Sequence, residues 1–274
     1  MKKILIPTDF SKNAEYALKV AAQIAKKNNG EIILLHMLEL PNQGSDAVVS
    51  GKSIPEIMFF KNAAMNKLED LMDADYLKGI PVSEIIQFEL AFDGILNISK
   101  KNDVDLIVMG SHGASGFKEM FIGSNAEKVV RNSEIPVLII KEENDNFEVN
   151  DFVFASDFSE EIKKPFEKVV AVAEKFGAKL HVVTINTPSN FKPTAVSESI
   201  MHNFLANFKS DAIVTHIYND TSIEGGVLNF ANSINADLIG MSTHGRKGLS
   251  HFLNGSISED LVNHSVRPVI TFKI

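Results

Sequence analysis

Residues 105–124 read DLIVMGSHGASGFKEMFIGS, and residues 237–256 read DLIGMSTHGRKGLSHFLNGS. The first stretch has the spacing G-x2-G-x9-G-S, which runs from Gly110 through Gly113 to Gly123 and Ser124. The second stretch keeps this spacing, except that Ser242 replaces the opening glycine. In both, an apolar run typical of a strand precedes the loop, and a helical pattern follows its last glycine. The chain therefore contains the same strand-loop-helix unit twice.

A loop of this kind suits an anion. Glycines allow positive φ and close approach of the backbone to a ligand, and a helix N-terminus offers unpaired N–H groups with a partial positive charge. We therefore predict a phosphate-binding loop from Gly110 to Ser124. A Gly-Ser pair before a helix is also an ordinary turn with an N-cap, and for either copy alone this explanation stays open.

The repetition extends well beyond these loops. Several residues recur at one constant offset, namely Gly94 with Gly226, Leu96 with Leu228, Glu127 with Glu259 and Pro136 with Pro268. Residues 8–11 (TDFS) match residues 156–159 (SDFS) at a larger offset, so the first half holds extra chain between about Leu40 and Gly79. Two copies predict paired domains, because a solenoid needs at least three units. We place the domains at 1–145 and 146–274, joined by the acidic residues 142–146.

Composition limits the function classes. The chain has 274 residues, of which 45% are hydrophobic, enough for two globular domains. Zero cysteines exclude disulfides, thiolate chemistry and Cys-ligated metals, and the net charge of −8 without a basic tract disfavours nucleic acid as a partner. No apolar segment suffices to span a bilayer, and Met1 leads into a strand without signal-peptide features. We expect a cytoplasmic protein with no membrane partner.

Strands and helices are predicted to alternate in each half. In the first half, strands are expected at residues 3–7, 31–38, 85–90, 105–109 and 137–140, and helices at 13–27, through Leu68 to Met72, at 93–101 and at 124–132. In the second half, strands are expected at 152–155, 179–185, 212–217, 237–241 and 269–272, with helices from about Lys164 and at 198–208. Pro165 should lie in the first turn of its helix. Such alternation predicts doubly wound α/β domains with parallel sheets.

Asp9 is the second candidate ligand-binding feature. In an open α/β sheet, ligands bind at the carboxyl ends of the strands. Asp9 follows the first strand and the Gly110 loop follows the fourth, so both are expected to face one crevice. There Asp9 could accept a hydrogen bond from a ribose hydroxyl or an adenine amino group. The alternative is an Asp-Phe-Ser turn that caps the first helix.

Four segments resemble the universal stress proteins: ILIPTDFS at 4–11, LLHM at 34–37, MGSHG at 109–113 with Gly123 and Ser124, and IPV at 135–137. The resemblance covers nearly all of both halves. It implies a five-stranded parallel sheet of order 3-2-1-4-5 in each half and ATP or AMP, with or without Mg²⁺, bound at the strand ends. It assigns the adenine side to Pro7, Asp9, Met37 and Met109, and the phosphate side to Gly110, Gly113, Gly123, Ser124 and Asn125.

The resemblance also implies an assembly. In this family the last strand commonly pairs across a two-fold axis to make a dimer. A tandem chain can form that dimer internally, as a pseudo-dimer with residues 137–140 against residues 269–272. A homodimer of the full chain stays open.

The second half departs from the family pattern at three positions. Ala155 stands for Pro7, Thr184 is assigned to the position of Met37, and Ser242 stands for Gly110. A side chain at Ser242 is expected to crowd the sugar and phosphate or to forbid the required backbone angle. The second site would consist of the retained residues Asp157, Gly245, Gly255 and Ser256. We favour the first site and leave the second open.

The sequence lacks the usual signatures of a dedicated catalyst. It has no G-x4-GK[ST] loop, no G-x-G-x-x-G, no G-x-S-x-G and no His/Cys metal cluster. His112 and His244 recur inside the loops, where we expect them to order the backbone. We therefore expect a stress-response regulatory protein that binds adenine nucleotide mainly in its first half, with no catalytic residue and no metal site. Two alternatives are an enzyme that slowly hydrolyses ATP or transfers a nucleotide through Asp9 or His112, and an interaction scaffold without nucleotide.

Overall fold

Strands and helices alternate along the computed structural model, which describes residues 1–38, 54–112, 122–208, 210–243 and 255–274. The contacts between residues divide the chain into two units. Unit 1 comprises residues 1–118, 123–129 and 140–146, and unit 2 comprises residues 119–122, 130–139 and 147–274. Unit 2 thus includes the end of one helix and most of the last strand of the first repeat.

The α-helices and strands follow the same order in each repeat, whereas the short 3-10 helices η1 and η2 lie at different places. In the first repeat the elements are β1 (Lys3–Pro7), α1 (Lys12–Asn28), β2 (Glu31–Met37), α2 (Ile54–Met72), η1 (Asp75–Leu77), β3 (Val82–Gln87), α3 (Ala91–Lys101), β4 (Leu106–Gly110), α4 (Ser124–Asn132) and β5 (Val137–Ile140). In the second repeat they are β6 (Asp151–Ala155), η2 (Glu160–Ile162), α5 (Lys163–Phe176), β7 (Lys179–Asn186), α6 (Thr194–Leu205), β8 (Ile213–Asn219), α7 (Ile223–Ser233), β9 (Leu238–Thr243), α8 (Gly255–His264) and β10 (Val269–Lys273).

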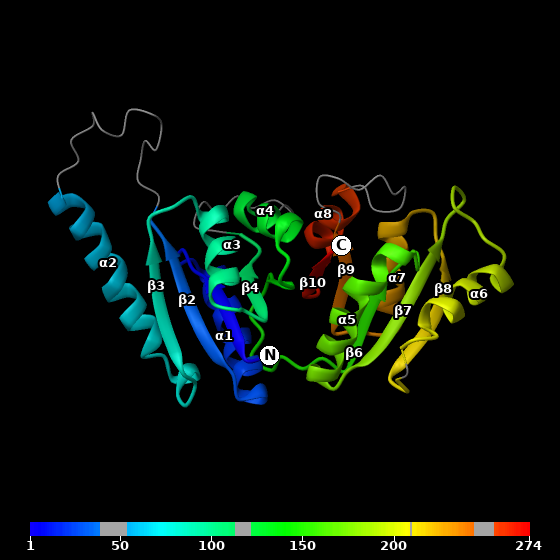
Figure 1. Cartoon of the computed structure of the whole chain (residues 1–274), viewed down its shortest axis with the longest axis horizontal. Coiled ribbons are helices and arrows are strands. Elements are labelled where there is room, and N and C mark those ends of the chain that lie inside the picture. Colours follow the sequence, from blue (N-terminus) through cyan, green and yellow to red (C-terminus); the bar gives the residue numbers. More distant parts are fainter. Residues whose placement is uncertain (39–53, 113–121, 209, 244–254) are drawn as a thin grey trace. The chain divides into compact units, whose positions relative to one another are not determined.

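The strands of unit 1 follow the order β3-β2-β1-β4, and the pairs are parallel (Figure 1). In unit 2 the order is β5-β10-β9-β6-β7-β8, and only β5 runs antiparallel, against β10. The second repeat therefore has the predicted order 3-2-1-4-5. The predicted antiparallel pairing of the two last strands is confirmed, with Val269 opposite Ile139 and Thr271 opposite Val137.

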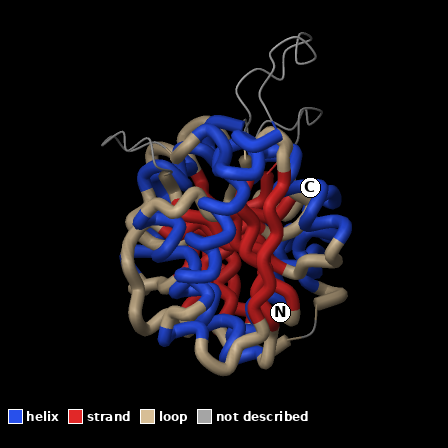
Figure 2. The backbone as a smooth tube through the Cα atoms, turned by 90° about the vertical axis from the view of Figure 1, so that its left-hand side faces the viewer, coloured by secondary structure: helices blue, strands red, loops and turns tan. Residues whose placement is uncertain are grey.

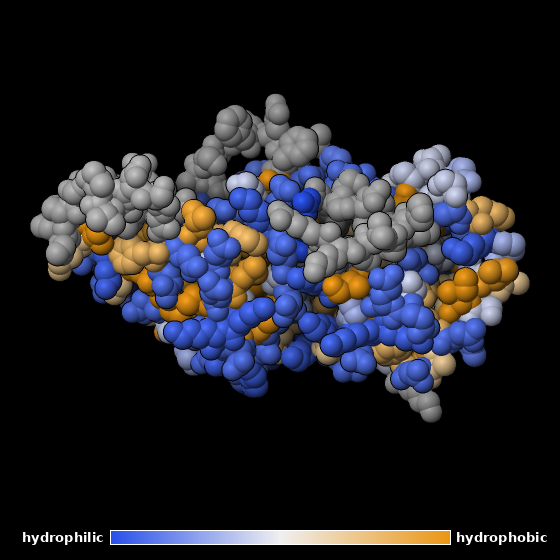
Figure 3. Space-filling view, turned by 45° about the horizontal axis from the view of Figure 1, so that its top comes forward, coloured by the Kyte–Doolittle hydropathy of each residue, from blue (hydrophilic) through white to orange (hydrophobic). Residues whose placement is uncertain are grey.

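The central strands are buried on both faces because helices lie on both sides of the sheet (Figure 2). Ile4, Leu5 and Ile6 of β1 are fully buried, which explains why this strand reads as a continuous apolar run. Full burial of such a side chain contributes about 1.5–3 kcal/mol. On α2, by contrast, Phe59 is 68% exposed. Figure 3 shows apolar surface at the left of the view, the side on which α2 lies.

Recurring glycines allow helices to pack closely on strands. A Cβ on Gly94 of α3 would lie 2.1 Å from Cε of Met37 on β2, and one on Gly226 of α7 would lie 2.4 Å from Cγ2 of Ile185 on β7. Both distances are far below van der Waals contact, so a larger residue would require the facing side chain to move or the helix to shift from its sheet. The equivalence also shows that Ile185, and not Thr184, occupies the position of Met37. The assignment from sequence was therefore wrong by one residue.

Asp105 and Asp237, which recur just before β4 and β9, bind backbone at the amino ends of the strands, away from the glycine loops. Asp105 accepts a hydrogen bond from the backbone N–H of Lys3 at 3.1 Å, and Asp237 accepts one from that of Asp151 at 3.0 Å. Each carboxylate therefore binds the strand that starts its repeat. The recurrence of Asp105 and Asp237 has this structural cause.

Two elements begin at least three residues earlier than predicted. The third strand spans Val82–Gln87 and not 85–90, because its pairing with β2 begins at Val82 opposite Ile32, and Leu90 already precedes α3 as its N-cap residue. The helix expected at 198–208 spans Thr194–Leu205, since the carbonyl of Pro193 accepts from the N–H of Ser197 and closes the first turn. Pro165 lies in the first turn of α5, as predicted. Of the extra chain expected between about Leu40 and Gly79, the residues up to 53 lie outside the described residues.

Candidate functional site

A pocket of about 350 Å³ opens in unit 1 at the carboxyl ends of β1, β2 and β4. Its lining includes eight of the nine residues proposed for the first site, namely Pro7, Asp9, Met37, Met109, Gly110, Gly123, Ser124 and Asn125. The ninth, Gly113, lies outside the described residues. Residues from four separate segments of the chain thus meet in one crevice, as the strand order requires.

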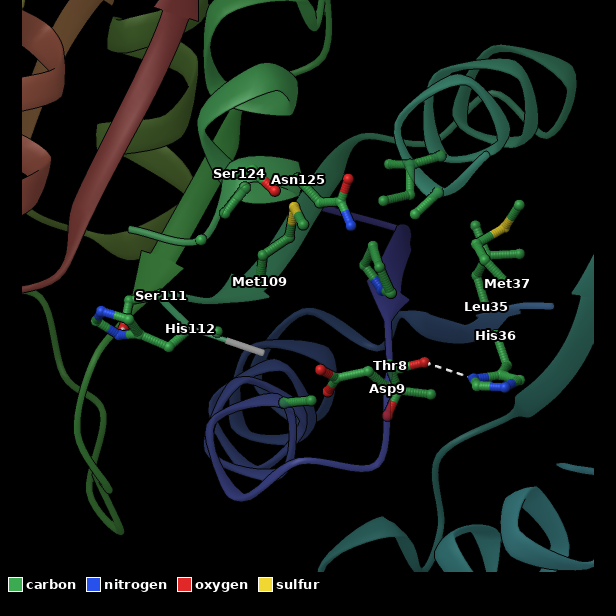
Figure 4. A pocket seen from close by; sticks show the side chains of 17 residues that line it. Thr8, Asp9, Leu35, His36, Met37, Met109, Ser111, His112, Ser124 and Asn125 are labelled. Carbon is green, nitrogen blue, oxygen red and sulfur yellow. Dashed lines mark hydrogen bonds between the residues drawn. The ribbon is translucent and has the colours of Figure 1, made fainter. Parts of the chain in front are cut away.

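Polar and apolar side chains occupy different parts of this pocket (Figure 4). Ser124 and Asn125 lie close to Met109 on one side, whereas Asp9 lies across the pocket from them. Leu35 and Met37 form an apolar wall away from Ser111 and His112. The pocket therefore offers an apolar surface for a flat ring and a polar end for a charged group.

Asp9 takes part in a turn that both repeats share. Its Oδ1 accepts from the backbone N–H of Ser11 at 3.0 Å, and Phe10 has φ +63°. In the second repeat, Asp157 Oδ1 accepts from Ser159 N–H at 3.0 Å, and Phe158 has φ +59°. The proposed Asp-Phe-Ser turn therefore exists, with Ser11 as the N-cap of α1. Because Asp9 also lines the pocket, the turn fixes the direction of its carboxylate.

Gly110 is required for space and not for a special backbone angle. A Cβ at this position would lie 2.6 Å from the backbone carbonyl of Asn13 in α1. Among the described glycines, only Gly79 and Gly177 have positive φ. Of the two reasons expected against a side chain here, the forbidden backbone angle is therefore wrong for Gly110, and steric crowding applies, although against α1. The role of Gly110 is to let the start of α1 approach the end of β4.

The backbone on either side of the glycine loop is closely bonded. Ser111 N–H donates to Ile140 O at 2.9 Å, and Gly123 N–H donates to Ser111 O at 2.7 Å. The Oγ of Ser111 lies 2.9 Å from Nδ1 of His112. This contact agrees with a loop-ordering role for His112. The two ends of the loop are therefore joined directly at Ser111.

The N-terminus of α4 faces the polar part of the pocket. The helix begins at Ser124, and its first intrahelical hydrogen bond runs from Glu127 N–H to Gly123 O at 2.9 Å. Ser124 and Asn125 are exposed at the pocket rim. Backbone N–H groups in a first helical turn carry partial positive charge and suit an anion such as phosphate.

His36 and Thr8 were not identified from the sequence, yet both line the pocket. The Nδ1 of His36 lies 2.8 Å from the carbonyl oxygen of Thr8, which joins the ends of β1 and β2 (Figure 4). The ring of Phe10 packs against that of His36, with centroids 4.4 Å apart. The sequence did contain a signal for His36, because this polar residue interrupts an otherwise apolar strand and directly precedes Met37.

Lys141 adds a positively charged side chain immediately after β5. It directly follows Ile140, whose carbonyl accepts from Ser111 in the pocket wall. Burial lowers the pKa of the Lys141 amine to about 8, while Glu142 acts in the opposite direction. At neutral pH the side chain is therefore still mainly protonated.

The equivalent region of the second repeat has bulkier side chains. Counted from the shared aspartate, Ile162 takes the position of the pocket residue Ala14, and Ile162 is fully buried. Ser242, at the position of Gly110, is also fully buried. Gly245 lies outside the described residues, and Gly255 begins α8 together with Ser256.

Comparisons with known proteins agree with this architecture. The model of the universal stress protein family matches residues 1–141 and again 149–273. The chain belongs to the universal stress protein family. Universal stress protein MJ0577 of Methanocaldococcus jannaschii is 35% identical over 159 residues, which cover 52% of this chain and 96% of that protein. Universal stress protein Slr1230 of Synechocystis is 21% identical and matches the full length of both chains.

A universal stress protein from Archaeoglobus fulgidus has a similar solved structure, with 26% identity and a TM-score of 0.72. The match covers 99% of this chain and 96% of that one, so this tandem universal stress protein shares its fold along its whole length. In the part of the chain that the structure describes, no helix is long and apolar enough to cross a membrane.

Proposed function

We propose that this universal stress protein binds an adenine nucleotide in the pocket of its first repeat and acts as a regulatory protein, not as a dedicated enzyme. The observation that carries the proposal is the meeting of Asp9 with the N-terminus of α4 across one pocket. An acceptor for hydroxyl or amino groups faces a donor-rich helix terminus there. These two features match the two ends of a nucleotide, because its ribose and base carry hydroxyl and amino donors and its phosphates accept hydrogen bonds.

The dimensions and polarity of the pocket support this ligand class. A volume of about 350 Å³ lies in the lower part of the range for small-molecule sites, about 300–1,000 Å³. The adenine would lie against the apolar wall that contains Leu35 and Met37, with the ribose near Asp9. The phosphates would lie at Ser124 and Asn125, on the backbone N–H groups of α4. Mg²⁺, where it accompanies ATP, would be bound mainly by the phosphate oxygens.

The second repeat is proposed to bind nucleotide weakly or not at all. Ile162 fills space where the first repeat has Ala14, and Ser242 adds a side chain where the first has Gly110. The turn at Asp157 is nevertheless intact. The second repeat therefore retains the Asp-Phe-Ser turn, while Ile162 and Ser242 take up space beside it that is open in the first repeat.

A matched pair of aspartate variants tests this assignment. Asn can preserve the Oδ1 acceptor that holds each turn, so Asp9→Asn and Asp157→Asn should both remain folded. Calorimetric titration of the wild type with ATP and with AMP, each with and without Mg²⁺, should show one nucleotide per chain. Asp9→Asn should weaken binding about tenfold, the cost of about one hydrogen bond to a charged group. Asp157→Asn should match the wild type.

Three results would contradict the proposal. Absence of binding to the wild type under all conditions would favour an interaction scaffold. Equal losses in the two variants would place the nucleotide in both repeats or in neither pocket. Sustained ATP turnover that Asp9→Asn or His112→Ala abolishes would instead support the enzyme alternative.

A further inference from the structure

A side chain of the second repeat binds the backbone that enters α4 of the first repeat. The N–H of Ile122 donates to Oδ1 of Asn263 at 2.7 Å, and both residues belong to unit 2. Ile122 is 7% exposed and Asn263 is 9% exposed. A buried backbone N–H requires an acceptor, because an unsatisfied one costs about 1–3 kcal/mol. Asn263 supplies this acceptor from α8.

The bonded residue occupies a sensitive place in the chain. Ile122 directly precedes Gly123, whose own N–H donates to Ser111 O at 2.7 Å. Two successive N–H groups are thus held just before α4 begins at Ser124. Because Gly123 and Ser124 line the pocket, the position of Ile122 sets where the first turn of α4 points.

The other end of α4 is also held by the second repeat within unit 2. Lys273 Nζ donates to Asn132 O at 3.1 Å, and Thr243 Oγ1 donates to Val130 O at 3.4 Å. These carbonyls belong to the last turn of the helix, where a cation and a hydroxyl donor satisfy groups without intrahelical partners. Contacts from β9 and β10 therefore hold the last turn of α4.

The anchoring residue is not repeated. By the offset that relates the recurring glycines Gly94 and Gly226, the residue of the first repeat that corresponds to Asn263 is Arg131. A guanidinium has donors only and cannot accept from a backbone N–H. Arg131 therefore cannot supply an equivalent side-chain acceptor.

We propose that Asn263 is a positioning residue for the phosphate end of the nucleotide site in the first repeat. The inference rests on the proposed function, which it extends. Through Ile122, Asn263 holds the backbone that leads directly into Gly123 and Ser124 at the start of α4. Its influence is confined to the phosphate end, because the apolar wall at Leu35 and Met37 comes from other segments.

The experiment compares ATP with adenosine in the full-length chain. In Asn263→Leu the acceptor is lost, so ATP should bind about tenfold more weakly, whereas adenosine affinity should stay within about twofold of wild type. Asn263→Asp keeps an acceptor oxygen and should recover most of the ATP affinity. Ser265→Ala is the matched control, since Ser265 bonds the carbonyl of Arg267 two residues further on and not the loop. It should bind both ligands as the wild type does.

Hydrogen exchange of the Ile122 amide gives a second readout that needs no ligand. This amide should be protected in the wild type and in Ser265→Ala and should exchange faster in Asn263→Leu. Equal loss of ATP and adenosine affinity, or unchanged exchange at Ile122, would overturn the proposal. A wild type that binds neither ligand would refute the proposed function instead, and the exchange at Ile122 would still decide whether Asn263 holds the loop.

Discussion

Gly110 lies so close to Asn13 that a Cβ on the glycine would be 2.6 Å from the backbone carbonyl carbon and oxygen of Asn13. Gly110 ends β4, and Asn13 lies in the first turn of α1. The obstacle is main chain, which cannot rotate away as a flexible side chain could. This contact sets the approach of α1 to β4 at the floor of the pocket.

Gly110→Ala should therefore destabilise the protein by about 1–3 kcal/mol, as expected for overpacking against a rigid neighbour. The helix must shift to accept the methyl group, so nucleotide affinity should fall as well. Denaturant unfolding followed by circular dichroism measures the first effect, and calorimetric titration the second. A variant with wild-type stability would show that α1 moves at no cost and that the glycine has another role.

Two buried hydroxyls in the second repeat lead to the opposite expectation. Among the described residues, Ser242 Oγ and Thr271 Oγ1 have no hydrogen-bond partner and are buried. Removing such a group relieves a desolvation cost, so Ser242→Ala and Thr271→Val should each stabilise the protein by about 1 kcal/mol. Thr243→Val is the control, because Thr243 donates to Val130 O and should be less stable without its hydroxyl. A loss of stability in both test variants would contradict this account.

The order of elements could be predicted because apolar periodicity and repetition act over many residues. Val137–Ile140 was placed correctly, as was its antiparallel partner, since four consecutive apolar residues at a sheet edge require cover. The third strand was displaced because Phe88 and Leu90 extend its apolar run, although they lead into α3. Propensity alone does not reveal that pairing with β2 begins at Val82.

Candidate site residues could be proposed from the sequence where few roles suit a residue type, as for glycine. They could not be proposed where contacts between distant residues decide the role. Gly110 was proposed from the glycine spacing, but the contact that requires a glycine there is with the backbone of Asn13, which is far away in the sequence. Thr184 was wrongly aligned with Met37, although the offset that relates Asp9 to Asp157 already places Ile185 there, as the pairing of β7 with β6 confirms. The contact of Asn263 with Ile122 carries no sequence signal, since it joins residues of different repeats.

A histidine pair in unit 2 predicts a dependence of stability on pH. His181 Nδ1 lies 2.9 Å from His216 Nε2, and His181 Nε2 lies 2.8 Å from Asp151 Oδ1. Burial lowers the pKa of His216, and His181 and Lys179 lower it further. The folded state therefore binds a proton at His216 less readily than the unfolded state does, and stability is lost as pH falls below the unfolded value of about 6.5.

The measurement is the free energy of unfolding between about pH 8 and about pH 5, an interval that includes the unperturbed histidine pKa of about 6.5. His216→Gln cannot take up this proton, and its amide can still donate to His181, so its stability should decline less steeply below neutral pH. His202→Gln, at an exposed position of α6, should retain the wild-type slope. Identical slopes for all three proteins would exclude His216 as the titrating group.

The antiparallel pair of β5 and β10 predicts the behaviour of a separated first half. Residues 137–140 are at most 1% exposed, and β10 covers their edge through the pairing of Val269 with Ile139 and Thr271 with Val137. A chain of residues 1–145 lacks β10, so its last strand would present an unpaired apolar edge, which readily binds another chain. We therefore expect residues 1–145 to self-associate in sedimentation velocity, and addition of residues 146–274 should replace this association by a one-to-one complex. A first half that stays strictly monomeric at high concentration and ignores the second half would contradict the internal pseudo-dimer that we propose for this tandem chain.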